Sequence, residues 1–183
     1  RFKPQNGRED FFTEKYQSAR RGLLRTPVPV FRISGKFGMR KKHPILGYSK
    51  MHKGVDFAAP RNTPIYAAGD GVVSFVGRGN GYGKYVKIRH NNKLTTLYAH
   101  INKFAKRLRK GMRVKQGQTI AFIGKTGWAT GYHLHFELRK NGRHVNPLKF
   151  KLPSMKVLKG QDREAFKNHI SYINSLLAGK VSI

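Results

Sequence analysis

Short runs of β-branched and aromatic residues, separated by breaks that contain glycine or asparagine, dominate the chain from residue 34 to residue 150. They include residues 72–76, 85–89, 94–100 and 119–123, which alternate with Gly69-Asp70-Gly71, Asn91-Asn92 and Gly117. Runs of this kind are strand and hairpin signals. We therefore expect residues 34–150 to form a mainly β domain built on a compact antiparallel sheet, with many of the 20 glycines in its turns.

The segment before this domain, residues 1–33, reads as a lead-in. Its apolar residues follow no clean period, and Pro27 and Pro29 favour an extended connection into the domain. Because the chain opens on Arg1 rather than Met, we interpret the lead-in as the remnant of an upstream region. A full-length protein could carry a membrane anchor there.

The segment after the domain, residues 151–183, is expected to be a helical extension. Apolar residues recur at spacings of three and four, which predicts a helix over residues 160–178. Asp162 is the candidate N-cap and Gly179 the candidate stop. We expect this helix to pack on the sheet.

Charge and cysteine content limit the function classes. The chain has 38 Lys and Arg against 8 Asp and Glu, a net charge of +30, which favours polyanionic partners such as nucleic acid, an acidic membrane face or a carboxylate-rich cell wall. It contains no cysteine, which excludes disulfides and thiolate metal sites. We find no nucleic-acid recognition motif and no apolar run of the roughly 18 residues that suggest a transmembrane segment.

Four histidines and one aspartate stand at spacings typical of a metal site. They read His52-x3-Asp56, His133-Leu134-His135 and, between these two motifs, His100. Two imidazoles and one carboxylate make a typical ligand set for a catalytic zinc. Asp56 is one of only two acidic residues between Glu14 and Glu137, so its position four residues after a histidine calls for a specific role.

The segment His133–Leu138 alternates strictly between polar and apolar residues. On a strand, His133 and His135 then share one face, where both could bind metal or one could bind while the other moves protons. No Glu of the His-Glu-x-x-His kind is present, so a histidine must act as the base. We expect Glu137 to make a charge pair or to contact a ligand rather than the metal. We interpret the remaining histidines as structural; they are His43, His90, His144 and His169.

Several stretches together carry a family resemblance: Ser34–Arg40, His43–Gly47, His52–Pro60, Thr63–Ile65, Ala68–Gly71, Tyr98–His100, Gly124–Gly127 and Gly131–Glu137. With them, the chain resembles the lysostaphin/LytM-type zinc metallopeptidases, which cut peptide cross-bridges of bacterial peptidoglycan. The entry Arg21–Val28, the exit Asn146–Leu148 and the tail Gly160–Phe166 look like the Gram-negative murein DD-endopeptidase branch, which is MepM-like.

The resemblance implies a LytM/lysostaphin-like, barrel-sandwich-like fold and one Zn²⁺ per chain. It assigns His52, Asp56 and His135 to the metal, and His100 and His133 to catalysis. The implied enzyme is a zinc metallo-endopeptidase that hydrolyses peptidoglycan stem-peptide cross-links, such as the D-Ala–meso-diaminopimelate bond. Its implied place is the periplasm or cell envelope of a Gram-negative bacterium, where a regulatory or adaptor protein could be a further partner.

Four residues near these motifs are candidate contacts for the substrate, namely Asn80, Tyr98, Trp128 and Tyr132. The aromatic ones could instead fill the local core, and Asn80 could be a plain turn residue. Two other functions stay open from the residues alone. The chain could be a non-catalytic wall binder or an activator of other murein hydrolases, or its charge could serve nucleic-acid binding without sequence readout.

Overall fold

The computed structural model describes residues 1–5, 9–18, 22–40, 49–150 and 157–179. Within it the chain divides into two compact units. The larger comprises Leu23–Lys151, and the smaller combines Arg1–Gly22 with Leu152–Ile183.

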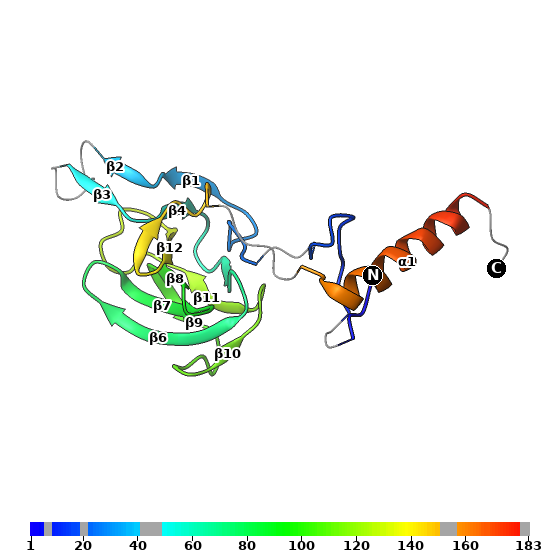
Figure 1. Ribbon diagram of the computed structural model, residues 1–183. Coiled ribbons are helices and arrows are strands. Elements are labelled where there is room, and N and C mark those ends of the chain that lie inside the picture. The colour runs from blue at the N-terminus through cyan, green and yellow to red at the C-terminus, as the bar shows by residue number, and fades with distance from the viewer. Residues whose placement is uncertain (6–8, 19–21, 41–48, 151–156, 180–183) are drawn as a thin grey trace. The chain divides into compact units, whose positions relative to one another are not determined.

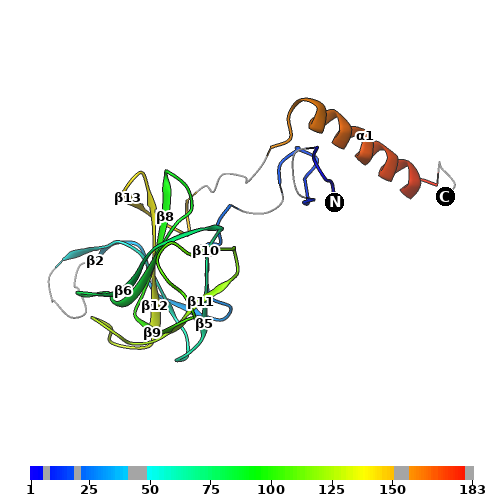
Figure 2. The same cartoon turned by 90° about the horizontal axis from the view of Figure 1, so that it is seen from below.

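The larger unit is built from thirteen strands among the described residues. They are β1 Arg32–Gly35, β2 Gly38–Arg40, β3 Lys50–His52, β4 Val55–Ala58, β5 Pro64–Tyr66, β6 Gly71–Gly79, β7 Gly83–Arg89, β8 Leu94–Ala99, β9 Ile101–Phe104, β10 Arg113–Val114, β11 Thr119–Ile123, β12 His133–Lys140 and β13 Arg143–Val145. The expected strands are all present, so the mainly β fold class is confirmed (Figure 1, Figure 2).

The main sheet has the strand order β1-β4-β12-β8-β7-β6-β10, with β13 paired to β12. Its neighbouring strands pair antiparallel. Two smaller sheets, β5-β11-β9 and β2-β3, complete the unit. Because β12 lies between β4 and β8, it brings its two histidines beside Asp56 on one side and beside the end of β8 on the other.

One face of β12 points into the hydrophobic core, as the alternation predicts. Leu134, Phe136 and Leu138 are buried, and Phe136 pairs with the buried Tyr98 of β8. The opposite face is covered as well, because His135 is 8% exposed and Glu137 is 0% exposed. The polar face of β12 is therefore a buried functional face rather than a solvated one.

His52 is the last residue of strand β3. The chain then reverses through Lys53 and Gly54 into β4, where Asp56 is the second residue. A side chain at Gly54 would meet the carbonyl oxygen of Phe136 at 2.5 Å and the ring of His135 at 2.8 Å. Glycine is needed here because the loop passes directly over His135.

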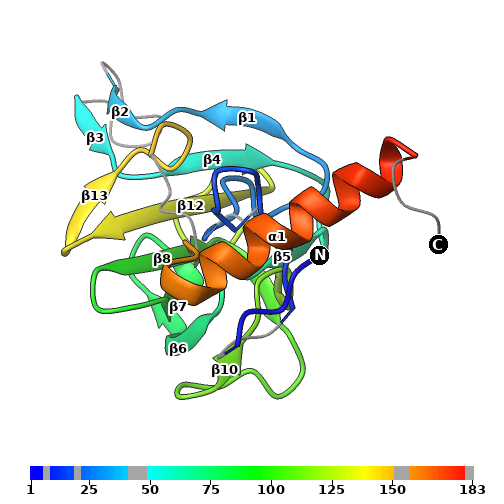
Figure 3. The same cartoon turned by 45° about the vertical axis from the view of Figure 1, so that its right-hand side comes forward.

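The smaller unit contains helix α1, Gly160–Leu177 (Figure 3). Its buried residue Phe166 packs against aromatic rings of the N-terminal segment. Its ring lies 5.1 Å from that of Phe2 and 5.7 Å from that of Phe12. The described packing of the helix is thus against the lead-in, and its packing on the sheet stays a prediction.

The ends of α1 correct one expectation and confirm another. Lys159 is the N-cap and makes no side-chain capping bond. Asp162 instead lies in the first turn and accepts a 2.8 Å hydrogen bond from the backbone N–H of Gln5. At the other end, Gly179 follows the helix with a φ of 65°, a left-handed stop that glycine adopts without strain.

The lead-in is divided between the units. Residues 23–33 belong to the larger unit, where Leu23 and Val28 are buried at 2% and 4% exposure. The backbone N–H of Leu24 donates to the carbonyl of Ala68, which fastens the segment to the domain. Among the described residues, no helix is long and apolar enough to cross a membrane.

Candidate metal centre

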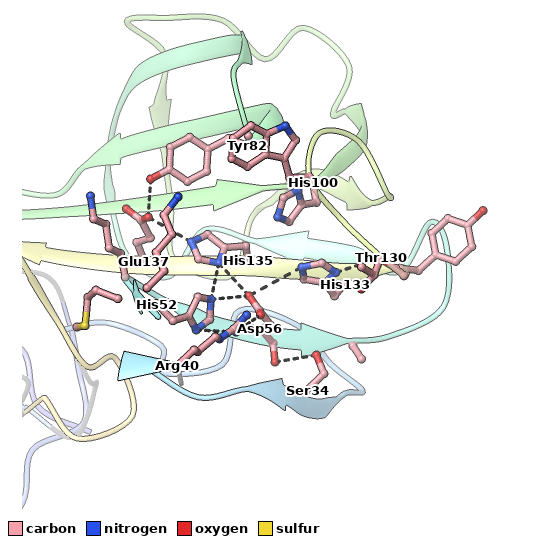
Figure 4. Close-up of a pocket in the computed structure, with 18 of the residues that line it drawn as sticks. Ser34, Arg40, His52, Asp56, Tyr82, His100, Thr130, His133, His135 and Glu137 are labelled. Atoms are coloured by element: carbon pink, nitrogen blue, oxygen red, sulfur yellow. Dashed lines mark hydrogen bonds and ion pairs between the residues drawn. The ribbon is translucent and has the colours of Figure 1, made fainter. Parts of the chain in front are cut away.

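Three side chains converge on one point between β3, β4 and β12 (Figure 4). Asp56 Oδ1 lies 2.8 Å from His135 Nδ1 and 3.1 Å from His52 Nε2. The two imidazole nitrogens lie 3.1 Å apart. His52, Asp56 and His135 are the group that could hold a metal among the described residues.

Each imidazole has a second nitrogen fixed away from this point. His52 Nδ1 lies 2.7 Å from the carbonyl oxygen of Lys36 and 2.8 Å from Arg40 Nη2, and His135 Nε2 lies 3.2 Å from Glu137 Oε1. When these outer nitrogens donate, the lone pairs of His52 Nε2 and His135 Nδ1 point at each other and at the Asp56 carboxylate. Such a donor set requires a positive charge at its centre, which fits a divalent cation.

The pKa values of Asp56 and His135 also indicate that a positive charge is needed at the centre of this site. Burial would raise the pKa of Asp56, but its hydrogen bonds to His135 and His52 outweigh burial and hold that pKa well below its usual range. Burial would lower the pKa of His135, yet the hydrogen bonds to Asp56 and Glu137 raise it to about 9. A proton and a metal ion are alternatives for the same place, so metal binding should release a proton.

His100 lies next to this group in a strained backbone conformation. It joins β8 to β9 with a φ of 62°, which is uncommon outside glycine and asparagine. Two hydrogen bonds hold it there: its backbone N–H donates to Tyr82 O at 2.9 Å, and its Nδ1 lies 2.7 Å from Thr126 O. Burial, followed by the nearby His133, lowers the pKa of His100 to about 4.

A close pair of glycines fixes the two loops that hold His100. Gly83 and Gly127 have φ values of 63° and 74°, and a side chain on either would overlap the backbone of the other. The neighbouring N–H of Trp128 donates to Gly81 O at 2.8 Å. This contact places the carbonyl groups of Tyr82 and Thr126 on either side of His100.

His133 stands at the start of β12 with its ring 4.6 Å from that of His100. Its Nδ1 lies 2.9 Å from Gly131 O, and its Nε2 lies 3.9 Å from Asp56 Oδ1. Burial lowers the pKa of His133, although Asp56 acts in the opposite direction. Both histidines are therefore neutral at neutral pH, and each can accept a proton on Nε2.

Glu137 supports His135 from behind and does not join the metal group. Its Oε1 accepts from Tyr82 at 2.6 Å and from His135, while its Oε2 lies 2.8 Å from Arg139 Nη2 and 3.0 Å from His144 Nε2. The expected charge pair is present. His144, interpreted from sequence as structural, is one of its partners.

Arg40 is a site residue that no sequence pattern singles out. Its guanidinium donates to Asp56 Oδ2 at 2.7 Å, which leaves Oδ1 to face the two histidines. It approaches Asp56 from β2, the strand that pairs with β3, and so ties this small sheet to the metal group. The pair can be recognised only after the fold brings residues sixteen positions apart together.

A groove of about 520 Å³ contains the metal group, His100 and His133. Of the candidate substrate contacts, Asn80, Trp128 and Tyr132 line it. Tyr98 does not, because it is fully buried and its hydroxyl accepts the N–H of Ala68 at 2.8 Å. The core interpretation therefore replaces the substrate-binding one for Tyr98.

The other histidines are not among the residues that line the groove, or they fall outside the described residues. His90 lies 2.7 Å from Thr96 Oγ1 and 2.8 Å from Asp70 O, so it is a structural residue. The ring of His169 packs 6.0 Å from that of Phe2 in the smaller unit. His43 falls outside the described residues.

Comparison with known proteins places these features in a family. Residues 50–147 match the family model described as peptidase family M23. The chain is 41% identical over 157 residues to the peptidoglycan DD-endopeptidase ShyC of Vibrio cholerae, covering 86% of this chain and 36% of that protein. It is 45% identical over 152 residues to the DD-carboxypeptidase/endopeptidase Mpg of Neisseria meningitidis, covering 83% of this chain and 34% of that protein.

Solved structures agree. A zinc containing peptidase from Vibrio cholerae superposes with a TM-score of 0.67 at 38% identity, covering 78% of this chain and 46% of that one. Csd3 of Helicobacter pylori gives 0.61 at 39% identity, covering 98% of this chain and 48% of that one. The chain spans about a third of the length of the two curated relatives named above.

Proposed function

The chain belongs to peptidase family M23, and we propose that it is a zinc-dependent endopeptidase acting on the peptide cross-links of bacterial peptidoglycan. The observation that carries the proposal is the convergence of His52, Asp56 and His135 within a groove that also holds two neutral histidines. The bond we propose is D-Ala–meso-diaminopimelate, since relatives named DD-endopeptidases match most of this chain.

His52 Nε2, Asp56 Oδ1 and His135 Nδ1 would hold the zinc. When bound, zinc supplies a Lewis acid that lowers the pKa of water and polarises the scissile carbonyl. The residues of the chain supply orientation and proton transfer. Glu137 fixes the tautomer of His135, and Arg40 fixes the rotation of the Asp56 carboxylate.

Proton transfer falls to His100 and His133. Their Nδ1 atoms face backbone carbonyls, so the Nε2 lone pairs are the available bases. Because burial keeps both rings neutral, either can take the proton of the attacking water and later pass it to the leaving amine. We propose His100 as the base and His133 as the group that stabilises the oxyanion or the base.

Asn80, Trp128 and Tyr132 would contact the peptide along the groove. Trp128 and Tyr132 are 53% and 46% exposed, so their rings are open to a ligand. The same function favours the periplasm or cell envelope of a Gram-negative bacterium, with peptidoglycan as the macromolecular partner.

The decisive experiment incubates the zinc-loaded protein with a defined cross-linked muropeptide and identifies the products by mass spectrometry. Cleavage that stops with a chelator, returns with zinc and is absent in His135→Ala supports the proposal and reports the bond. Full cutting by the metal-free protein would overturn it.

The alternative, a non-catalytic binder or activator of other murein hydrolases, predicts a different result. In that case His135→Ala would fold normally and support wild-type wall growth in cells. Retention of all five site residues in one groove favours the enzyme.

A further inference from the structure

Exposed cations gather at the end of the main sheet that lies away from the groove. Strand pairing defines the two ends: Lys140 of β12 pairs with Leu94 and Arg143, while Arg89 of β7 pairs with Val72. We call this the basic end, and its exposed cations are Arg89, Lys93, Lys110, Arg113, Lys140 and Arg143.

The groove occupies the other end of the same strands. Strand β12 begins at His133, and the loop after β6 carries Asn80, both of which line the groove. The eight residues of β12 put roughly 23 Å between His133 and Lys140 at about 3.3 Å per residue. A surface bound at the basic end would leave the groove open.

Few carboxylates offset these cations. The acidic residues of the larger unit are Asp56, Asp70 and Glu137. Asp56 and Glu137 line the groove, and each is paired with an arginine, Arg40 and Arg139 respectively. Asp70 precedes β6 at the basic end, but its Oδ1 accepts the N–H of Gln116 at 2.7 Å. No ion pair involving the six cations is found among the described residues.

Backbone hydrogen bonds tie together the turns that carry the cations. Asn141 N donates to Lys93 O at 2.7 Å, which joins the β12–β13 turn to the β7–β8 turn. The N–H of Gly111 donates to Val73 O at 2.8 Å, and Val73 N donates to Met112 O at 2.9 Å. The turns that carry the cations are therefore held in place, which lowers the entropy cost of binding several anionic groups at once.

We propose that the basic end docks the protein on an anionic phospholipid membrane surface. Clusters of four to eight Lys and Arg are attracted to anionic headgroups. The choice of membrane over wall polymer rests on the proposed function: a wall strand must enter the groove, whereas a membrane bound at the basic end leaves the groove facing away, toward the wall. A base-reading groove or helix, which nucleic-acid recognition would use, is absent from the described residues of this end.

The test measures co-sedimentation of the protein with phosphatidylglycerol–phosphatidylethanolamine vesicles and with neutral phosphatidylcholine vesicles at about 0.15 M salt. We expect partitioning onto the anionic vesicles only. The triple variant Lys93→Gln, Lys110→Gln, Arg143→Gln should reduce the partition coefficient on the order of 100-fold.

A matched variant controls for net charge. Arg61→Gln, Arg78→Gln and Lys125→Gln remove the same charge from exposed positions that neither line the groove nor belong to the basic end. We expect this variant to lose at most a few-fold. Equal loss in both variants, no binding to anionic vesicles, or tighter binding of the same end to duplex DNA would each overturn the proposal.

Hydrolysis of a soluble muropeptide separates this proposal from the proposed function. Both triple variants should cut it at the wild-type rate, because none of the six substituted positions lines the groove. If the wild type binds vesicles but does not hydrolyse the muropeptide, the proposed peptidase function is wrong, and with it the reason for preferring a membrane over the wall. If the wild type hydrolyses the muropeptide but does not bind vesicles, only the docking surface is wrong.

Discussion

Glu137→Gln tests how the metal group is held in place. The carboxylate is fully buried and faces donors on both oxygens: Tyr82 and His135 on Oε1, Arg139 and His144 on Oε2. The amide of glutamine has the same shape but one acceptor oxygen. Whichever way it turns, its NH₂ group meets either the Nε2–H of His135 or the guanidinium of Arg139, so one buried donor is left without an acceptor.

The size of the effect follows from the acid–base properties of Glu137. Burial would raise its pKa, but hydrogen bonds from His135 and Tyr82 lower it from 4.5 to about 2. At 1.36 kcal/mol per unit of pKa, this difference corresponds to about 3 kcal/mol of folding stability at neutral pH. Because the folded-state pKa is depressed, that contribution is present above pH 4.5 and is lost as the pH falls toward 2.

Urea unfolding of the metal-free protein should therefore show Glu137→Gln to be about 3 kcal/mol less stable at neutral pH, with the gap closing in acid. Zinc titration should show an affinity about 10- to 100-fold weaker, because His135 loses the acceptor that fixes its tautomer. Glu164→Gln, the same change at an exposed helix position, is the control. Wild-type stability and zinc affinity in Glu137→Gln would refute the reasoning.

Three further changes separate metal binding, proton transfer and folding. His52→Ala should abolish stoichiometric zinc binding and hydrolysis together; stoichiometric zinc by atomic absorption would contradict its role as a ligand. His100→Ala should keep one zinc per chain and lose about 100- to 10,000-fold in kcat, so an unchanged kcat would exclude it as the base. Because burial lowers the pKa of His90 from 6.5, its neutral form is favoured in the fold, and the wild type should lose stability as the pH falls below 6.5. His90→Asn should show a flatter pH dependence by urea unfolding, and an equal slope would contradict the cause.

The strands could be predicted from sequence because local patterns determine them, whereas the assignment of His52, Asp56 and His135 to the metal came from the family resemblance. The run of residues 72–76 became β6, and the alternation at His133–Leu138 became β12. A strand fixes the direction of each side chain at a period of two, so the alternation alone predicts that His133 and His135 share one face. The closeness of Asp56 to His135 depends on the pairing of β4 with β12, which no local pattern predicts. At the level of sequence, only the family resemblance brings His52 and Asp56 together with His135.

What the sequence could not supply is the set of long-range partners. Arg40 reaches Asp56 from another sheet, and Tyr82 reaches Glu137 across fifty-five positions. Tyr98 was predicted as a substrate contact because it is close in sequence to His100, and the structure contradicts this prediction. Its register on β8 places it in the core opposite Phe136, and its hydroxyl is satisfied by the N–H of Ala68. A tyrosine can be buried wherever its hydroxyl finds a partner.

The net positive charge at the surface of the domain depends on where its few carboxylates lie. Asp56 and Glu137 are both held by an arginine and both orient the metal group. Neither is therefore available to neutralise surface cations, and the positive field reaches solvent. A uniform distribution of this field would give only solubility and nonspecific attraction. Six exposed cations stand on hydrogen-bonded turns at the end of the sheet opposite the groove. From that end their charge can orient the molecule, so position rather than net charge should decide what the domain binds.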